Sequence, residues 1–170
     1  MPDYTAEHAA AGIKTKLPAL ETRPNQFPNY VITTKFPEYS SVCPKTGLPD
    51  FGTITIQYVP RKDCIELKSL KMYLLAYRDL GIFYENAVNK MLRDIVAAID
   101  PEWCIVKGEF TPRGGLTTNI YARWPELPHA GTAKVQASKS RKNLLSRPNR
   151  FNREPKDPRC SYDNDRETRI

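Results

Sequence analysis

The sequence has 170 residues, of which 40% are hydrophobic, so it is long enough and apolar enough for one compact domain with a core. The net charge of +7 is concentrated in residues 132–170, where 11 basic and 5 acidic residues give +6. The rest of the chain is therefore almost neutral, which argues against a nucleic-acid groove built on the body of the protein.

Neither a metal site nor a membrane location is predicted. The four cysteines show no C-x-x-C spacing and the only two histidines lie far apart, so no tetrahedral set of zinc ligands is expected. No apolar run approaches the roughly 18 residues of a membrane span, and the first residues lack the pattern of a secretion signal. We expect a cytoplasmic protein with reduced thiols and no bound metal.

The first half of the domain alternates between apolar and polar residues, as β-strands do. Residues 1–29 lack a lasting period and are expected to form an N-terminal arm. Tyr30–Phe36 is predicted to be the first strand and Thr53–Val59 the second, ended by a proline. Between them, Glu38 to Asp50 is rich in proline and glycine and is predicted to be a loop rather than part of a strand.

The period then changes to that of helices. Glu66 to Arg78 and Phe83 to Ile99 are predicted to be helices with one apolar face each. Two more strands follow, near Trp103–Phe110 and Leu116–Arg123, joined by a hairpin turn with paired glycines. The buried face of the first helix is predicted to contain Leu67, Leu70, Leu74 and Tyr77.

The order strand, strand, helix, helix, strand, strand predicts an α+β domain, with an antiparallel sheet and two helices on one of its faces. This domain is expected to span residues 30–124, followed by a basic, disordered tail at 125–170. A four-stranded sheet has two free edges, and joining edges between subunits into a barrel would cover them. The expected assembly is therefore a ring oligomer.

The loop between the first two strands carries a thiol, Cys43, and a carboxyl group, Asp50. A nucleophile and a proton donor on one stiff loop are a plausible catalytic pair. A lone cysteine is, however, more often a small buried hydrophobic residue. The loop by itself leaves both interpretations open.

Four motifs in the expected order resemble the single-module members of the QueF family, the NADPH-dependent 7-cyano-7-deazaguanine reductases. They are S-S-V-C-P-K-T-G-L-P-D-F-G, E-L-K-S-L-K-M-Y, F-Y-E-N and F-T-P-R-G-G, and the resemblance covers about residues 28–124. It implies the tunnelling fold and a homo-oligomer of two pentameric rings, with active sites between neighbouring subunits.

The resemblance also implies a reaction, the four-electron reduction of the nitrile of 7-cyano-7-deazaguanine to the amine of 7-aminomethyl-7-deazaguanine. This nitrile reductase step belongs to queuosine biosynthesis, a tRNA modification pathway. Cys43 matches the nucleophile that forms a covalent thioimide, and Asp50 matches the proton donor.

The remaining motif residues match binding positions of the family. Those implied for the substrate are Ile65, Glu66, Leu67, Tyr84 and Glu85. Those implied for NADPH are Lys68, Ser69, Lys71 and Arg113. Tyr84 departs from the family pattern, because many members carry histidine there. Without the resemblance, Glu85 would be an ordinary first-turn glutamate and the lysines a solvated helix face.

Two alternatives remain open. An amidine-forming relative attacks the same nitrile but lacks the NADPH motif, so the stretch from Lys68 to Lys71 favours the reductase. The other alternative is a nucleic-acid-binding module that uses the basic tail, although the nearly neutral body argues against nucleic acid as a partner.

Overall fold

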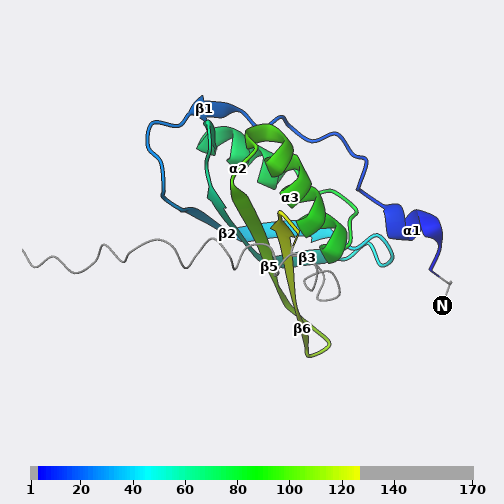
Figure 1. Ribbon diagram of the computed structural model, residues 1–170. Coiled ribbons are helices and arrows are strands. Elements are labelled where there is room, and N and C mark those ends of the chain that lie inside the picture. The colour runs from blue at the N-terminus through cyan, green and yellow to red at the C-terminus, as the bar shows by residue number, and fades with distance from the viewer. Residues whose placement is uncertain (1–3, 127–170) are drawn as a thin grey trace, which may run out of the picture. The chain divides into compact units, whose positions relative to one another are not determined.

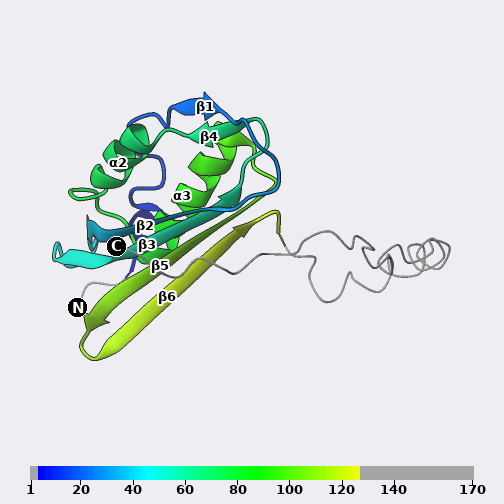
Figure 2. The ribbon, with the colours of Figure 1, turned by 90° about the vertical axis from the view of Figure 1, so that its left-hand side faces the viewer.

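A four-stranded antiparallel sheet is the base of the fold in the computed structural model, which describes residues 4–126. Its strands are β2 (Ile32–Val42), β3 (Pro49–Val59), β5 (Trp103–Arg113) and β6 (Leu116–Trp124), in the order β2-β3-β5-β6. Two helices, α2 (Leu67–Leu75) and α3 (Tyr84–Ile99), cover one face of this sheet (Figures 1 and 2). The predicted α+β class with antiparallel strands is confirmed. Nearly all of the predicted tail, residues 127–170, lies outside the described residues.

The first two strands are longer than the alternation of apolar residues indicated. β2 continues to Val42 and β3 begins at Pro49, so the prediction that the whole stretch from Glu38 to Asp50 is a loop was wrong. The pairing of β2 with β3 shifts between Phe36 and Tyr39, and this irregularity accommodates Pro37. Because β2 is an edge strand, Pro37 breaks no ladder on the outer side.

Three short elements had no periodic signal in the sequence. β1 (Thr22–Pro24) pairs with β4 (Asp63–Ile65) in a separate two-stranded antiparallel sheet, and three residues are too few to show alternation. The third is α1 (Ala6–Ala10), which is capped by Thr5.

The first residues of the amino-terminal arm contact the main body through Ala9 and Tyr4. The Asn86 side-chain amide in α3 donates a hydrogen bond of 2.7 Å to the Ala9 carbonyl in α1. Tyr4, which precedes α1 in the sequence, has its ring against that of Phe83. The Lys45 ammonium lies over the Tyr4 ring, 3.6 Å from its centroid. The arm is therefore attached beside the turn that follows β2.

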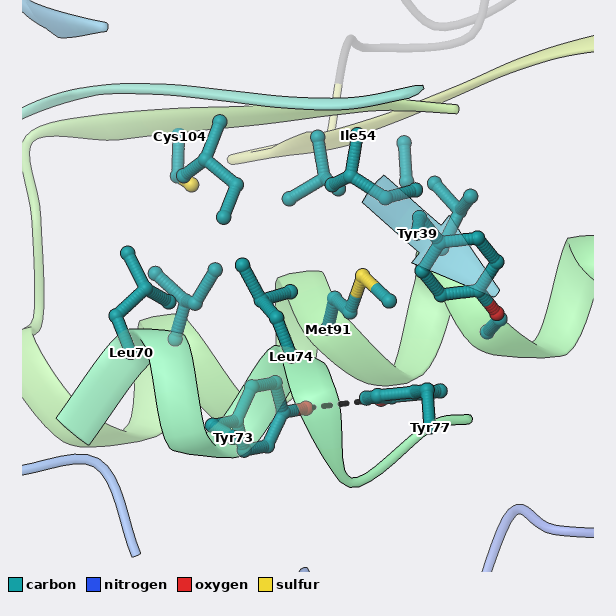
Figure 3. Close-up of a cluster of buried hydrophobic side chains, with 14 of the residues drawn as sticks. Tyr39, Ile54, Leu70, Tyr73, Leu74, Tyr77, Met91 and Cys104 are labelled. Carbon is teal, nitrogen blue, oxygen red and sulfur yellow. Dashed lines mark hydrogen bonds between the residues drawn. The ribbon is translucent and has the colours of Figure 1, made fainter. Parts of the chain in front are cut away.

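The core fills the space between the sheet and the two helices (Figure 3). Of the four residues predicted to be buried on α2 and just beyond it, Leu67 is 64% exposed, so that part of the prediction was wrong. Leu67 is the first residue of the helix, and Tyr73 is buried instead. None of the helices in residues 4–126 is long and apolar enough to cross a membrane. Major core residues include Tyr39, Ile54, Ile56, Leu70, Leu74, Tyr77, Val88, Met91, Ile95 and Val106.

The close approach of α3 to β5 depends on Gly108. A Cβ atom at this position would lie 2.7 Å from Val88 Cγ2, which is shorter than real contacts allow. We expect Gly108→Ala to lower the free energy of unfolding by about 1–3 kcal/mol, because overpacking displaces the helix. Urea unfolding measures this change. Gly81→Ala is the matched control, since a Cβ there meets nothing within 4 Å. Equal stability of the two variants would contradict the packing argument.

Candidate active site

The turn between β2 and β3 is closed by its own backbone. The Cys43 amide donates to the Leu48 carbonyl at 2.9 Å, and the Gly47 amide donates back to the Cys43 carbonyl at 2.9 Å. Gly47 has φ +68°, a conformation that glycine adopts at little cost. The Leu48 amide also donates to the Thr46 hydroxyl at 3.3 Å. Cys43 is thus held in a turn of defined shape, at the end of an edge strand.

The surroundings of Cys43 favour its thiolate. Burial of the partly exposed thiol opposes ionisation, but hydrogen bonds outweigh it and lower the pKa of Cys43 below that of an ordinary thiol. The donors are the Thr46 hydroxyl, the backbone amides of Thr46 and Lys45, and the Arg113 side chain. A thiolate is the nucleophilic form of cysteine, so Cys43 is suited to attack an electrophilic carbon. The other described cysteines, Cys64 and Cys104, are buried, and Cys160 lies outside the described residues.

Asp50 is held by two donors from different elements. The Tyr84 hydroxyl at the start of α3 donates to Oδ1 at 2.6 Å, and Arg113 Nη2 at the end of β5 lies 2.7 Å from the same oxygen. The Asp50 residue is only 3% exposed. Because both donors bind Oδ1, the carboxyl group is fixed in orientation and Oδ2 is available to carry a proton.

Arg113 also anchors the turn itself. Its Nη2 donates to the Pro49 carbonyl at 2.6 Å and to the Leu48 carbonyl at 3.3 Å. A guanidinium has five N–H donors, so the side chain, which is 39% exposed, retains donors for an anion. The sequence predicted Arg113 as a cofactor residue, and the contact with Asp50 is an addition that the motif did not indicate.

Tyr84 has a more specific environment than the sequence indicated. Its ring stacks on Phe110 with the centroids 3.8 Å apart. Burial, the hydrogen bond to Asp50 and the charge of Asp50 raise the pKa of Tyr84 to about 12. Its hydroxyl therefore keeps its proton at neutral pH and acts as a donor to Asp50. The stacking residue Phe110 was missed, although it opens the F-T-P-R-G-G motif.

The structure brings five of the predicted residues to one end of the sheet. There the β2–β3 and β5–β6 turns lie near one another (Figure 2). Glu85 follows Tyr84 in the first turn of α3 and is exposed, so its carboxylate is open to a ligand. The five residues are Cys43, Asp50, Tyr84, Glu85 and Arg113.

The remaining predicted residues lie toward the other end. The Ile65 amide donates to the Tyr58 hydroxyl at 3.1 Å. Tyr58 and Asp50 lie at opposite ends of β3, about 26 Å apart between Cα atoms at the ordinary strand rise. The start of α2 is therefore separated from Cys43 within one chain. The residues placed there are Ile65, Glu66, Leu67, Lys68, Ser69 and Lys71.

Two of these side chains are used inside the chain. The Glu66 carboxylate caps α2 by accepting from the backbone amides of Lys68 at 2.9 Å and Ser69 at 2.7 Å, which lowers the pKa of Glu66. The Ser69 hydroxyl accepts from the Glu21 amide at 2.9 Å and donates to the Glu66 carbonyl at 2.8 Å. By contrast, Leu67, Lys68 and Lys71 are exposed.

Comparisons with known proteins identify relatives of this chain. A family model described as "QueF-like protein" matches residues 49–128. The NADPH-dependent 7-cyano-7-deazaguanine reductase of Elusimicrobium minutum is 55% identical over 122 residues, covering 71% of this chain and 92% of the relative. The reductase of the same name from Chloroherpeton thalassium is 56% identical over 107 residues, covering 62% of this chain and 92% of the relative.

A solved structure shares the fold. The archaeosine synthase QueF-Like in its apo form matches with a TM-score of 0.52 and 22% identity. The match covers 58% of this chain and 95% of the other. At this identity the likeness concerns the fold alone.

The hydrogen bonds to Cys43 predict its reactivity. With a lowered pKa, more of the thiol is ionised at neutral pH, so the alkylation rate of Cys43 should reach its midpoint at lower pH than that of an ordinary thiol. Thr46→Val removes one donor, so the midpoint should rise and alkylation at pH 7 should slow about threefold.

The rate is measured with iodoacetamide in a Cys160→Ser background, so that the thiol at position 160 does not contribute. Thr46→Ser keeps the hydroxyl and serves as the control. A midpoint that is the same in Thr46→Val and Thr46→Ser would show that this hydroxyl does not tune Cys43.

Proposed function

This chain belongs to the QueF-like family, and from that premise we propose that it reduces the nitrile of 7-cyano-7-deazaguanine to the primary amine in an NADPH-dependent reaction. The observation that carries the proposal is the pairing of an activated thiol with an oriented carboxyl group. Cys43 has a lowered pKa on a closed turn, and Asp50 at the same end of the sheet is held through Oδ1 alone.

The first step is addition of Cys43 to the nitrile carbon. The Cys43 sulfur forms a bond to this carbon, one C–N π bond breaks, and the nitrogen takes up one proton, which gives a covalent thioimide. Asp50 is the proposed donor of that proton, through Oδ2. Asp50 receives that proton from Cys43 when the thiolate forms, so this step consumes no proton from solvent.

The later steps use the same two residues. Bound NADPH would supply the hydride of each reduction, and two reductions complete the conversion. Asp50 would protonate the nitrogen each time. After the first reduction the C–S bond breaks, and the Cys43 thiolate takes a proton from the iminium that is left, which gives a neutral imine for the second reduction. The covalent link keeps the half-reduced compound in the site and away from water.

Glu85 is proposed to bind the base. Its carboxylate can accept two hydrogen bonds from adjacent N–H donors, as the guanine-like edge of the substrate presents. Its position next to Tyr84 in the first turn of α3 supports this role. The backbone of Ile65, Glu66 and Leu67 is proposed to form the other side of the base pocket.

The cofactor is proposed to bind through positive charges. Lys68, Lys71 and Arg113 are at least partly exposed and suit the 2′-phosphate of NADPH. The Ser69 hydroxyl already has internal partners, so its proposed contribution is to shape the start of α2. We place the reaction in the cytoplasm, in queuosine biosynthesis.

The separation of these groups supports a shared site. One chain offers Cys43, Asp50 and Glu85 at one end of the sheet and the start of α2 toward the other. β2 and β6 are the edges of the sheet, so edge pairing between subunits could close a barrel. We propose a ring of subunits with the tunnelling fold, two pentamers in total, in which the start of α2 comes from a neighbour.

Replacing the two catalytic residues should have different effects. Cys43→Ala removes the nucleophile, so no adduct and no turnover are expected. Asp50→Asn keeps the shape but cannot donate a proton, so adduct formation and NADPH oxidation should slow roughly 10²–10⁴-fold. Intact mass spectrometry with the nitrile and without NADPH measures the adduct, and melting temperature checks folding. A folded Cys43→Ala protein that still reduces the nitrile would refute the mechanism. An adduct that adds ammonia and never oxidises NADPH would favour the amidine-forming alternative.

Mixing of variants tests the shared site. Cys43→Ala and Lys68→Ala are each expected to be weak or inactive alone. If a site combines Cys43 of one subunit with Lys68 of its neighbour, co-refolded equal mixtures should regain activity up to about a quarter of that of the unmodified protein. Mixing after assembly, without refolding, is the control. Equal mixtures that stay as inactive as the separate variants would argue that each chain builds its own site.

A further inference from the structure

Two buried hydroxyl groups, on Tyr39 and Ser41, have no hydrogen-bond partner within residues 4–126. Tyr39 is 1% exposed and Ser41 is 0% exposed. Such groups are rare, because an unpaired buried hydroxyl costs free energy. The Tyr39 hydroxyl takes no part in the hydrogen bond drawn in Figure 3, which joins Tyr73 and Tyr77. The other buried tyrosines of the core all have partners, namely Tyr58, Tyr73 and Tyr77.

Both hydroxyls lie beside the proposed proton donor. Tyr39 and Ser41 are two residues apart on β2 and face the core together, and Ser41 is the direct cross-strand partner of Asp50. Side chains of such pairs start about 5 Å apart at Cβ. Burial raises the pKa of Tyr39, the nearby Ser41 opposes this, and the charge of Asp50 adds to it. The three groups therefore share one buried space.

The reaction needs a supply of protons at this place, a requirement that rests on the proposed function. A nitrile gains four hydrogens on becoming a primary amine, two as hydrides and two as protons. The thiol of Cys43 covers the adduct step without any net uptake. One proton from solvent must then reach Asp50 for each of the two reductions.

Direct access of solvent to Asp50 is poor. The residue is 3% exposed even without ligands. The charged and titratable groups around it are Tyr84 from α3, Arg113 from β5, Cys43 from the turn and Tyr39 from β2. The first two bind Oδ1, and an adduct on Cys43 would cover the open side. Protons can then reach Asp50 only from the core side, where Ser41 lies.

We propose that Tyr39 and Ser41, with one water molecule held between their hydroxyls, form a relay that returns protons to Oδ2 of Asp50. Each hydroxyl donates one hydrogen bond and can accept others, so it can pass on one proton as it receives the next. A water in a polar site needs two to four partners, which two hydroxyls and a carboxyl group supply. Tyr39 also lines an open pocket with Glu38 and Asp79, and in this proposal solvent protons reach the buried hydroxyl from the side of that pocket.

If the relay operates, removing one of its hydroxyls should affect adduct formation and reduction differently. Tyr39→Phe and Ser41→Ala each remove one hydroxyl and leave Cys43 and Asp50 in place. Adduct formation should stay within about twofold, because it takes up no external proton. NADPH oxidation should slow about tenfold, less than the roughly 10²–10⁴-fold cost of losing the acid itself, and its solvent deuterium isotope effect should rise.

Tyr73→Phe is the matched control. It removes a buried hydroxyl that is bonded to Tyr77 at 3.0 Å and to Asp94 at 2.8 Å, outside the site. It should lower the melting temperature and leave both rates per folded molecule unchanged. The measurements are adduct formation by intact mass without NADPH, NADPH oxidation in H₂O and D₂O, and melting temperature.

The outcomes separate the relay from the reaction itself. Failure of the unmodified protein to form an adduct would reject the proposed reaction and the relay with it. Adduct formation with unchanged NADPH oxidation and isotope effects in Tyr39→Phe and Ser41→Ala would overturn the relay alone. An equal loss of the rates of adduct formation and NADPH oxidation would also overturn the relay, since it indicates that the two hydroxyls serve packing. A selective loss of NADPH oxidation in these two variants, absent in Tyr73→Phe, would support it.

Discussion

The contact of one carboxylate oxygen with two donors holds the candidate site together. Oδ1 of Asp50 accepts from Tyr84 on α3 and from Arg113 on β5, so a single atom ties a helix and two strands to the turn that carries Cys43. The carboxyl group is almost fully buried, and a charge in that setting depends on its partners. Arg113 adds contacts to two carbonyls of the turn, which makes the position of the thiol depend on the same side chain.

Much of the fold follows from local patterns in the sequence. The two periods, of strand and of helix, predicted the six main elements in their order, because each element buries one face. The ends of β2 and β3 were missed because proline resembles a loop signal in sequence. It is tolerated here since Pro37 lies on the edge strand β2 and Pro49 is the first residue of β3. β1 and β4 were missed because three residues carry no period. Leu67 was misplaced because the first residue of a helix can match its period and still face solvent.

The site was predictable only in part, for a different reason. Cys43, Asp50 and Arg113 were predicted as site residues from motifs, which report residue types at fixed local spacing. The contacts of Asp50 with Tyr84 and Arg113 join segments far apart in the chain, and no local pattern encodes them. The unpaired hydroxyls of Tyr39 and Ser41 are likewise visible only once burial is known. The roles proposed for them therefore depend on tertiary packing rather than on a sequence motif.

The attachment of the amino-terminal arm has a practical consequence. Tyr4 lies under Lys45, a residue of the turn that carries Cys43, and α1 is bonded to α3 one residue after Glu85. An affinity tag or fusion partner added in front of Tyr4 would therefore lie close to the turn that carries Cys43 and to the first turn of α3. Purification handles for this protein belong at the other terminus, and kinetic comparisons between differently tagged preparations would report on the tag as well as on the enzyme.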